Sequence, residues 1–177
     1  GVGNVAILDG GLGKWKAEGR PLSTEAPAPA AATFTPAPAA GRLRTRDAML
    51  ANLSSRAEQV VDARGAPRFT GSEPEPRPGM AAGHIPGARN VPYAALYNPD
   101  GTLKDTDALR ALFTDAGVDL ARPVVTTCGS GMTACAVAFA LDRIGKRDVA
   151  LYDGSWAEWG ADPATPKETG PGLAGRE

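Results

Sequence analysis

Cys128 is the residue with the most reactive surroundings in this sequence. It follows the apolar run Val124–Thr127 and opens a loop, residues 128–133 (CGSGMT), in which two glycines let the backbone curl tightly. Such a curl turns successive backbone N–H groups towards one point, and a helix that starts there adds its positive end. Both effects lower the pKa of a thiol. The sequence therefore predicts a Cys128 thiolate that can attack sulfur and hold a persulfide.

Other interpretations of the two cysteines stay open at this point. Cys128 could be a buried structural thiol, which is common for cysteine at a strand end. Cys135 lies two helical turns further along an Ala-rich segment and is interpreted as a small core residue, with a redox partnership to Cys128 as the alternative. Two cysteines and the single His84 do not make a zinc site, so no metal is expected.

The elements that must position Cys128 alternate between strands and helices. Strands are predicted at 59–62, 89–91, 123–127 and 149–152, with Phe34 near a possible first strand. Helices are predicted after the caps Thr45 and Thr106, and over 133–144. This order favours an α/β fold, a small parallel sheet with helices on both faces. Reactive groups in such sheets lie at the carboxyl ends of strands, where Cys128 stands.

The two ends of the chain resemble each other. Residues 5–15 and 149–159 share five identical positions, and each reads as a short buried strand, an Asp-Gly turn and a helical turn with a Trp that packs back. We expect residues 1–20 to be the end of a first domain of the same kind, 21–41 to be a Pro/Ala-rich linker, and 42–177 to be the catalytic domain. A companion segment would supply the rest of the first domain. Chance similarity is the alternative.

Composition limits the classes of partner. The apolar fraction is 42% and the formal charge is −1, so no field exists that would gather nucleic acid or bind an anionic membrane. No run of eighteen apolar residues occurs. We expect small molecules or proteins as partners and a cytoplasmic location, although the sequence begins without Met and an export signal is not excluded.

Four motifs together resemble the signatures of the rhodanese superfamily, in the family's order. They are residues 62–64 (DAR), 83–88 (GHIPGA), 128–135 (CGSGMTAC) and 153–159 (DGSWAEW). The 128–135 loop is similar to that of the tandem-domain 3-mercaptopyruvate sulfurtransferases, with Met132 where Val is more usual. The resemblance implies a sulfurtransferase that moves sulfur from 3-mercaptopyruvate to cyanide or a thiol acceptor such as thioredoxin. Sulfur would pass through a persulfide on Cys128, with no metal or organic cofactor.

The same resemblance implies roles for individual residues. Arg68 and Arg77 match arginines that grip the substrate, and a guanidinium can fork onto a carboxylate with two charge-assisted hydrogen bonds. The alternative is that both are solvated charges balanced by Glu73 and Glu75. Ser130 is placed to deliver or relay a proton to the pyruvate enolate. The remaining loop residues of the predicted site are Gly129, Gly131, Met132 and Thr133.

Further residues of the motifs are expected to be structural. Asp62 and Arg64 suit a buried ion pair under the loop. His84 is expected to stabilise a turn, and Trp156 and Trp159 are expected to pack in the core. Thiosulfate users of the family tend to carry cations in this loop, so the resemblance, with no cation at positions 129–132, implies mercaptopyruvate as the donor. Thiosulfate sulfurtransferase and a non-catalytic rhodanese interaction module remain as rivals. A Cys-dependent phosphatase of related fold would need an arginine soon after the loop, which is absent.

Overall fold

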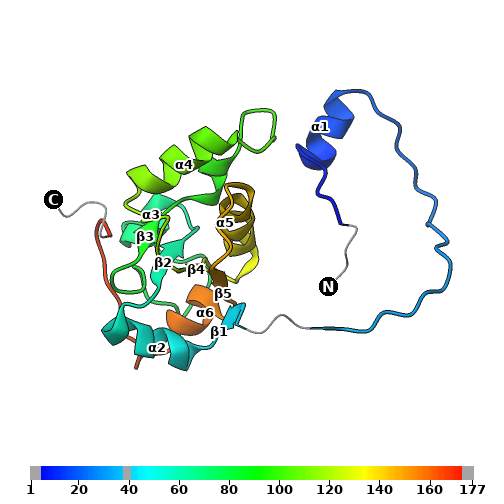
Figure 1. Ribbon diagram of the computed structural model, residues 1–177. Coiled ribbons are helices and arrows are strands. Elements are labelled where there is room, and N and C mark those ends of the chain that lie inside the picture. The colour runs from blue at the N-terminus through cyan, green and yellow to red at the C-terminus, as the bar shows by residue number, and fades with distance from the viewer. Residues whose placement is uncertain (1–4, 38–40, 173–177) are drawn as a thin grey trace.

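A five-stranded parallel sheet forms the centre of the fold in the computed structural model, which describes residues 5–37 and 41–172 (Figure 1). The spatial order of the strands is β1-β5-β4-β2-β3, which places β4 in the middle. The strands are β1 (Leu43–Arg44), β2 (Gln59–Asp62), β3 (Arg89–Asn90), β4 (Val124–Thr127) and β5 (Val149–Tyr152). All residues of β2 and β4 are buried, as expected for strands covered on both faces.

Helices cover both faces of the sheet, which confirms the predicted α/β class. The helices of the described residues are α1 (Gly11–Ala17), which has no buried residue and lies apart from the sheet, α2 (Arg46–Ser55), α3 (Ala66–Thr70), the 3₁₀ turn η1 (Tyr93–Leu96), α4 (Thr106–Asp115), α5 (Met132–Arg143) and α6 (Ser155–Trp159). Figure 1 shows α4 and α5 on one side of the sheet and α2 and α6 on the other. The core accordingly has two parts, one around Phe113 and Val137 and one around Met49, Trp156 and Trp159.

Side-chain caps fix where two of the helices begin. The Thr45 hydroxyl accepts a hydrogen bond from the Ala48 N–H at 3.2 Å, which confirms the predicted cap of α2. The prediction for Thr106 was wrong by one residue. The carboxylate of Asp105 accepts from the Ala108 N–H at 2.8 Å, and its negative charge suits the positive end of α4.

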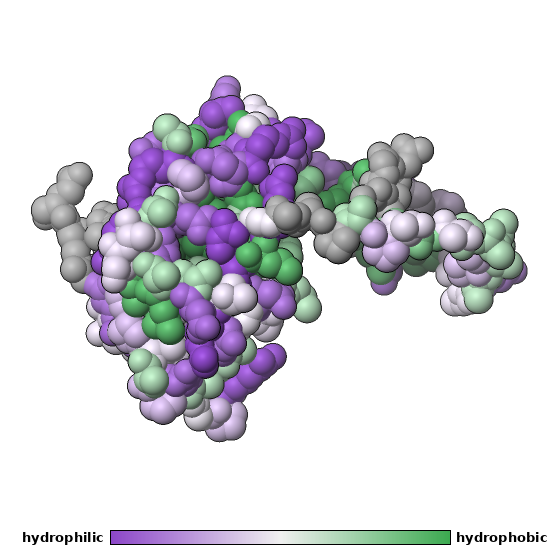
Figure 2. Space-filling view, turned by 60° about the horizontal axis from the view of Figure 1, so that its bottom comes forward, coloured by the Kyte–Doolittle hydropathy of each residue, from purple (hydrophilic) through white to green (hydrophobic). Residues whose placement is uncertain are grey.

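The first strand lies later in the chain than Phe34 suggested. Leu43 and Arg44 pair with Leu151 and Tyr152 of β5, whereas the Phe34 side chain is 61% exposed. Residues 21–37 contain several prolines, which lack the N–H that a strand donates to its neighbour. In Figure 2 this part of the chain projects from the globular part as a separate arm.

The N-terminal segment does not form the predicted buried strand. Residues 5–8 are extended without strand pairing, and Ile7 is 65% exposed, because no strand among the described residues lies beside them. The segment is held at the loop before α4. There the Asp9 carboxylate accepts from the Leu103 N–H at 2.8 Å, and Lys14 lies 3.2 Å from Asp100.

Candidate functional site

The loop after β4 curls around the sulfur of Cys128. Cys128 is buried, and α5 begins four residues later at Met132. Between them Gly131 has φ +84°, a conformation that glycine adopts without strain. A Cβ at Gly131 would lie 2.9 Å from the carbonyl oxygen and from Oδ1 of Asp153, so a side chain has no room there. The two features together require glycine at this position.

Hydrogen bonds at the mouth of this loop stabilise the thiolate form of Cys128. Burial of the side chain raises the pKa of the thiol. Hydrogen bonds from the Thr133 hydroxyl and from the backbone N–H groups of Ser130, Ala134 and Thr133 outweigh it and bring the pKa below its ordinary value. The donors that lower this pKa belong to the loop in which the sequence predicted converging N–H groups, although Cys128 also packs against the apolar core.

Ser155, which the sequence did not single out, fixes the loop from the neighbouring strand. Its hydroxyl oxygen accepts hydrogen bonds from the Cys128 N–H at 3.2 Å and the Thr127 hydroxyl at 3.3 Å, and donates to the Tyr152 carbonyl at 2.8 Å. Ser155 has φ +50°, an uncommon conformation for a residue with a side chain. The signal was its place three residues after the end of β5, the strand beside β4.

Two backbone hydrogen bonds also hold the Cys128 loop. Together with those of Ser155 they form what we call the clamp. The Trp156 N–H donates to the Cys128 carbonyl, and the Ala157 N–H donates to the Gly129 carbonyl, both at 2.9 Å. The first turn of α6 therefore holds the start of the Cys128 loop by main-chain contacts. This explains why the two distant motifs, residues 128–135 and 153–159, act as one unit in the fold.

A buried network of charges connects strand β2 to Arg68 beside the Cys128 loop. Arg64 Nη2 lies 2.7 Å from Asp62 Oδ2, and both side chains are almost fully buried, as the sequence predicted. The Arg64 guanidinium also stacks over the ring of Trp156, 4.4 Å from its centroid. Its Nη1 lies 2.8 Å from the carboxylate of Glu75, which is also buried. Burial lowers the pKa of Arg64, and the opposite charges of Asp62 and Glu75 reverse the shift, so it stays charged.

Glu75 also binds Arg68 and fixes the orientation of its guanidinium. The Glu75 carboxylate accepts from Arg68 Nε at 3.2 Å and from Nη2 at 2.5 Å. This bidentate contact pairs Arg68 with one of the two carboxylates that the alternative interpretation named as balancing its charge. The Arg68 guanidinium is 31% exposed and lies over the catalytic loop, with Nη2 3.1 Å from the point where a Cβ of Gly129 would be.

The structure does not bring all of the predicted site residues together. Arg77 is exposed and makes no side-chain hydrogen bond or ion pair within the described ranges 5–37 and 41–172. Ser130 is exposed at the mouth of the loop, and Met132 is 78% exposed. The geometry thus unites Arg68 with the Cys128 loop, while the role of Arg77 remains a prediction.

Cys135 corrects one expectation. It is exposed, and its thiol donates to the Gly131 carbonyl at 3.4 Å. The buried residues of α5 are Ala134, Val137, Ala140 and Leu141, and Cys135 projects to the side of that face. Burial and the charges of Cys128 and Asp153 raise the pKa of the Cys135 thiol, which favours its neutral form.

His84 has the surroundings of a structural residue. Its ring is buried and stacks on Phe69 with the ring centroids 3.8 Å apart, and Nδ1 lies 2.8 Å from the Phe69 carbonyl oxygen. Its backbone pairs with that of Glu168. These contacts tie residues 66–70 to the end of the chain.

Within residues 5–37 and 41–172, no group of three or more His, Cys, Asp or Glu side chains is arranged to hold a metal ion. Nor does any helix in those ranges have the length and apolar character needed to cross a membrane.

Comparison with known proteins places the fold and the loop in a wider group. The profile of the rhodanese-like domain matches residues 45–162. The human 3-mercaptopyruvate sulfurtransferase is 46% identical over 155 residues, 88% of this chain and 52% of that protein. The thiosulfate sulfurtransferase of Cricetulus griseus is 43% identical over 156 residues, again 88% of this chain and 52% of that protein. The chain thus spans about half the length of these relatives.

One similar solved structure contains a cysteine persulfide. It is EanB with a cysteine persulfide, in a tetrahedral intermediate state with ergothioneine. It is similar to this chain with a TM-score of 0.84 and 25% identity, over 96% of this chain and 43% of the other.

Proposed function

Because the chain belongs to the family of rhodanese-like domains, we propose that it carries a sulfurtransferase site in which Cys128 takes up and passes on one sulfur atom. The observation that carries the proposal is the set of donors around the Cys128 thiol. The N–H groups of Ser130, Thr133 and Ala134 and the Thr133 hydroxyl lower its pKa despite burial. A terminal persulfide sulfur, which is also an anion, would use the same donors.

The chemistry proceeds in two displacements. The Cys128 thiolate attacks the sulfur of 3-mercaptopyruvate, the carbon–sulfur bond breaks, and pyruvate leaves as its enolate with the electron pair. The enolate takes a proton, which Ser130 delivers or relays from solvent at the mouth of the loop. An acceptor thiolate then attacks the outer sulfur, the sulfur–sulfur bond breaks, and the Cys128 thiolate is restored.

Arg68 is the residue we assign to the donor's carboxylate. Its Nε and Nη2 are bound by Glu75, so the guanidinium plane is fixed over Gly129. Among the described residues Nη1 has no hydrogen-bond partner and remains available for a carboxylate oxygen. A pre-positioned guanidinium loses little conformational entropy when it binds.

Thiosulfate is the second candidate donor. Relatives named for thiosulfate are almost as similar to this chain as those named for 3-mercaptopyruvate. The absence of a cation at loop positions 129–132 favours mercaptopyruvate, because thiosulfate carries two negative charges and mercaptopyruvate one.

The ratio of the two activities tests this choice. The rates of sulfur transfer to cyanide would be measured with each donor over a range of concentrations. We expect a larger kcat/KM for 3-mercaptopyruvate, and no transfer from either donor by the Cys128→Ser variant. A larger kcat/KM for thiosulfate would overturn the donor assignment, and full activity of Cys128→Ser would overturn the site.

A thiol is the expected physiological acceptor. The mouth of the loop is open at Ser130 and Met132, so the thiol of a protein such as thioredoxin can approach the outer sulfur. A reactive cysteine of this kind suits a reducing compartment such as the cytoplasm. Product analysis with reduced thioredoxin, compared with a small dithiol, tests this acceptor.

We also propose that the N-terminal segment packs against a first domain of the same kind. Val5, Ile7, Leu8 and Leu12 are all more than half exposed, which is unusual for four apolar residues so close together. The relatives have about twice the length of this chain, and residues 5–15 repeat residues 149–159. A chain extended by that domain should protect the amides of residues 5–12 from hydrogen exchange; unchanged exchange would contradict the proposal.

A further inference from the structure

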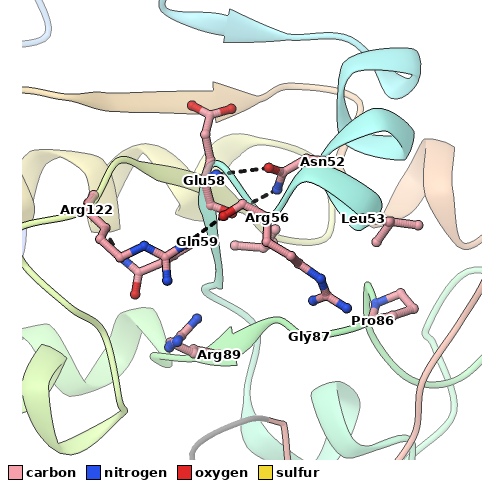
Figure 3. Close-up of a pocket in the computed structure, with 10 residues that line it drawn as sticks. Asn52, Leu53, Arg56, Glu58, Gln59, Pro86, Gly87, Arg89 and Arg122 are labelled. Carbon is pink, nitrogen blue, oxygen red and sulfur yellow. Dashed lines mark hydrogen bonds between the residues drawn. The ribbon is translucent and has the colours of Figure 1, made fainter.

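Three arginines from separate elements line one cavity at the end of the sheet opposite Cys128. Arg56 follows α2, Arg89 opens β3, and Arg122 lies two residues before β4. The cavity has a volume of about 300 Å³. Figure 3 shows the three side chains around the same space.

The three guanidinium groups have few partners. Within the described residues none of them forms an ion pair, although each guanidinium carries five N–H donors. Arg122 Nη2 donates to the Arg56 carbonyl at 2.6 Å, and Arg89 Nε donates to the carbonyl of Gly117. The Arg56 guanidinium has no hydrogen-bond partner in the same part of the chain. Most of the donors therefore remain available to a ligand.

Neighbouring carboxylates do not neutralise this charge. Glu58 borders the cavity, but Arg44 holds its carboxylate with two hydrogen bonds of 2.7 Å each. Glu168 accepts a backbone hydrogen bond from the loop before β3 at 2.9 Å. Asp119 faces Arg89 and offsets part of its charge. Arg44 pairs with Glu58, so three guanidinium charges stand against the carboxylates of Glu168 and Asp119, and the cavity stays positively charged.

The lowered pKa of Arg89 shows that its charged form is destabilised in this cluster. Burial lowers the pKa of Arg89, the charge of Arg122 lowers it further, and Asp119 only partly restores it. Like charges around a partly enclosed space repel one another, and an anion placed between them would remove that repulsion. Gly87 makes room for this cluster, because a Cβ there would collide with Nη1 of Arg56.

We propose that this cavity is a second binding site, for a small molecule that carries a doubly charged oxyanion group such as a phosphate monoester. Guanidinium groups match the geometry of such oxygens with paired hydrogen bonds. Leu53 and Pro86 form an apolar side of the same cavity. A bare phosphate would leave that side empty, so the ligand has a neutral or apolar body as well.

Chemical-shift titration of the protein's backbone amides tests this site. Inorganic phosphate and phenyl phosphate would be added separately, with sodium chloride at matched ionic strength as the control. We expect saturable shifts at Gln59, Gly87 and Arg89, tighter binding of phenyl phosphate, and no saturable shift with chloride. Absence of saturation with both phosphates would overturn the proposal, as would shifts confined to residues 128–133.

Matched variants locate the binding. Arg56→Gln loses no hydrogen bond within the described residues, so its fold should persist, and Arg122→Gln is the second variant. Each variant should bind phenyl phosphate about tenfold more weakly, a loss of roughly 1.4 kcal/mol in binding free energy. Arg143→Gln removes the same charge from the exposed end of α5 and should leave the affinity unchanged. An equal loss of affinity in Arg143→Gln would show a general effect of charge. A loss of affinity in Arg68→Gln only would show binding near Cys128. Either result contradicts the proposal.

Discussion

The hydroxyl oxygen of Ser155 lies 3.2 Å from the backbone nitrogen of Cys128 and accepts its hydrogen bond. The contact joins the ends of β4 and β5, two neighbouring strands, and it leaves the other N–H groups of the loop free to turn towards the sulfur. The reactivity of Cys128 thus depends on a residue that never touches the thiol itself.

Removal of this hydroxyl should loosen the loop. Ser155→Ala leaves the Cys128 N–H and the Thr127 hydroxyl without their acceptor, at a cost of about 1–3 kcal/mol in the free energy of unfolding. Urea denaturation measures that cost, and alkylation by iodoacetamide should slow at neutral pH. Ser155→Gly removes the same hydroxyl but relieves the strain at φ +50°, so it should lose less stability. Equal stability of Ser155→Ala and the parent would disprove the clamp.

The pH dependence of Cys128 should move when Thr133 loses its hydroxyl. The pKa of Cys128 lies below its ordinary value, so the thiolate is present above that lowered pKa and disappears as the pH falls through it. Thr133→Val deletes one donor and raises the pKa, so the midpoint of alkylation against pH moves upwards and the rate at neutral pH falls several-fold. An unchanged midpoint would show that the backbone amides alone set the pKa. Ser130→Ala, which keeps its N–H, is the matched control and should leave the midpoint in place.

Arg68 and Arg77 should differ in their effect on the donor. Arg68 is fixed by Glu75 over Gly129, whereas Arg77 is exposed and makes no side-chain hydrogen bond or ion pair with the described residues. Arg68→Gln should lower kcat/KM for 3-mercaptopyruvate about ten- to a hundredfold, since a hydrogen bond to a charged group contributes about 1.5–3 kcal/mol. Arg77→Gln should change it less. A larger effect of Arg77→Gln would contradict the assignment of the donor's carboxylate to Arg68.

The ion pair of Asp62 and Arg64 should be a major source of stability. Asp62→Ala leaves a buried guanidinium with one carboxylate fewer and should cost about 3–5 kcal/mol in the free energy of unfolding. The exposed pair of Arg147 and Asp142 supplies the control, and Asp142→Ala should cost less than about 1 kcal/mol. Similar costs for the two variants in urea denaturation would contradict the role assigned to Asp62.

Sequence patterns predicted the elements that local chemistry defines. The strands at 59–62, 124–127 and 149–152 were found because their apolar runs end at turn residues, and α2 because Thr45 caps it. Position 128 was found because glycine spacing reveals a tight loop. These signals lie within a few residues of the feature that they predict.

Features that depend on tertiary contacts escaped the sequence. Ser155 acts on Cys128 only because β5 lies beside β4, a neighbour relation that no local pattern reveals. Cys135 looked like a core residue by composition, but the direction of each side chain on α5 is fixed by packing. Strand β1 is only two residues long and exists because β5 offers an unpaired edge.

The central claim is that Cys128 carries the transferred sulfur, and intact mass after donor treatment tests it most directly. The Cys135→Ser variant would be used, so that Cys128 is the cysteine left to react. It would be incubated with 3-mercaptopyruvate in the absence of an acceptor, and its intact mass would then be measured. The account predicts a mass increase of one sulfur atom that disappears on addition of a thiol acceptor and never forms in the Cys128→Ser variant. An unchanged mass with both 3-mercaptopyruvate and thiosulfate, in protein whose Cys128 still reacts with iodoacetamide, would contradict it.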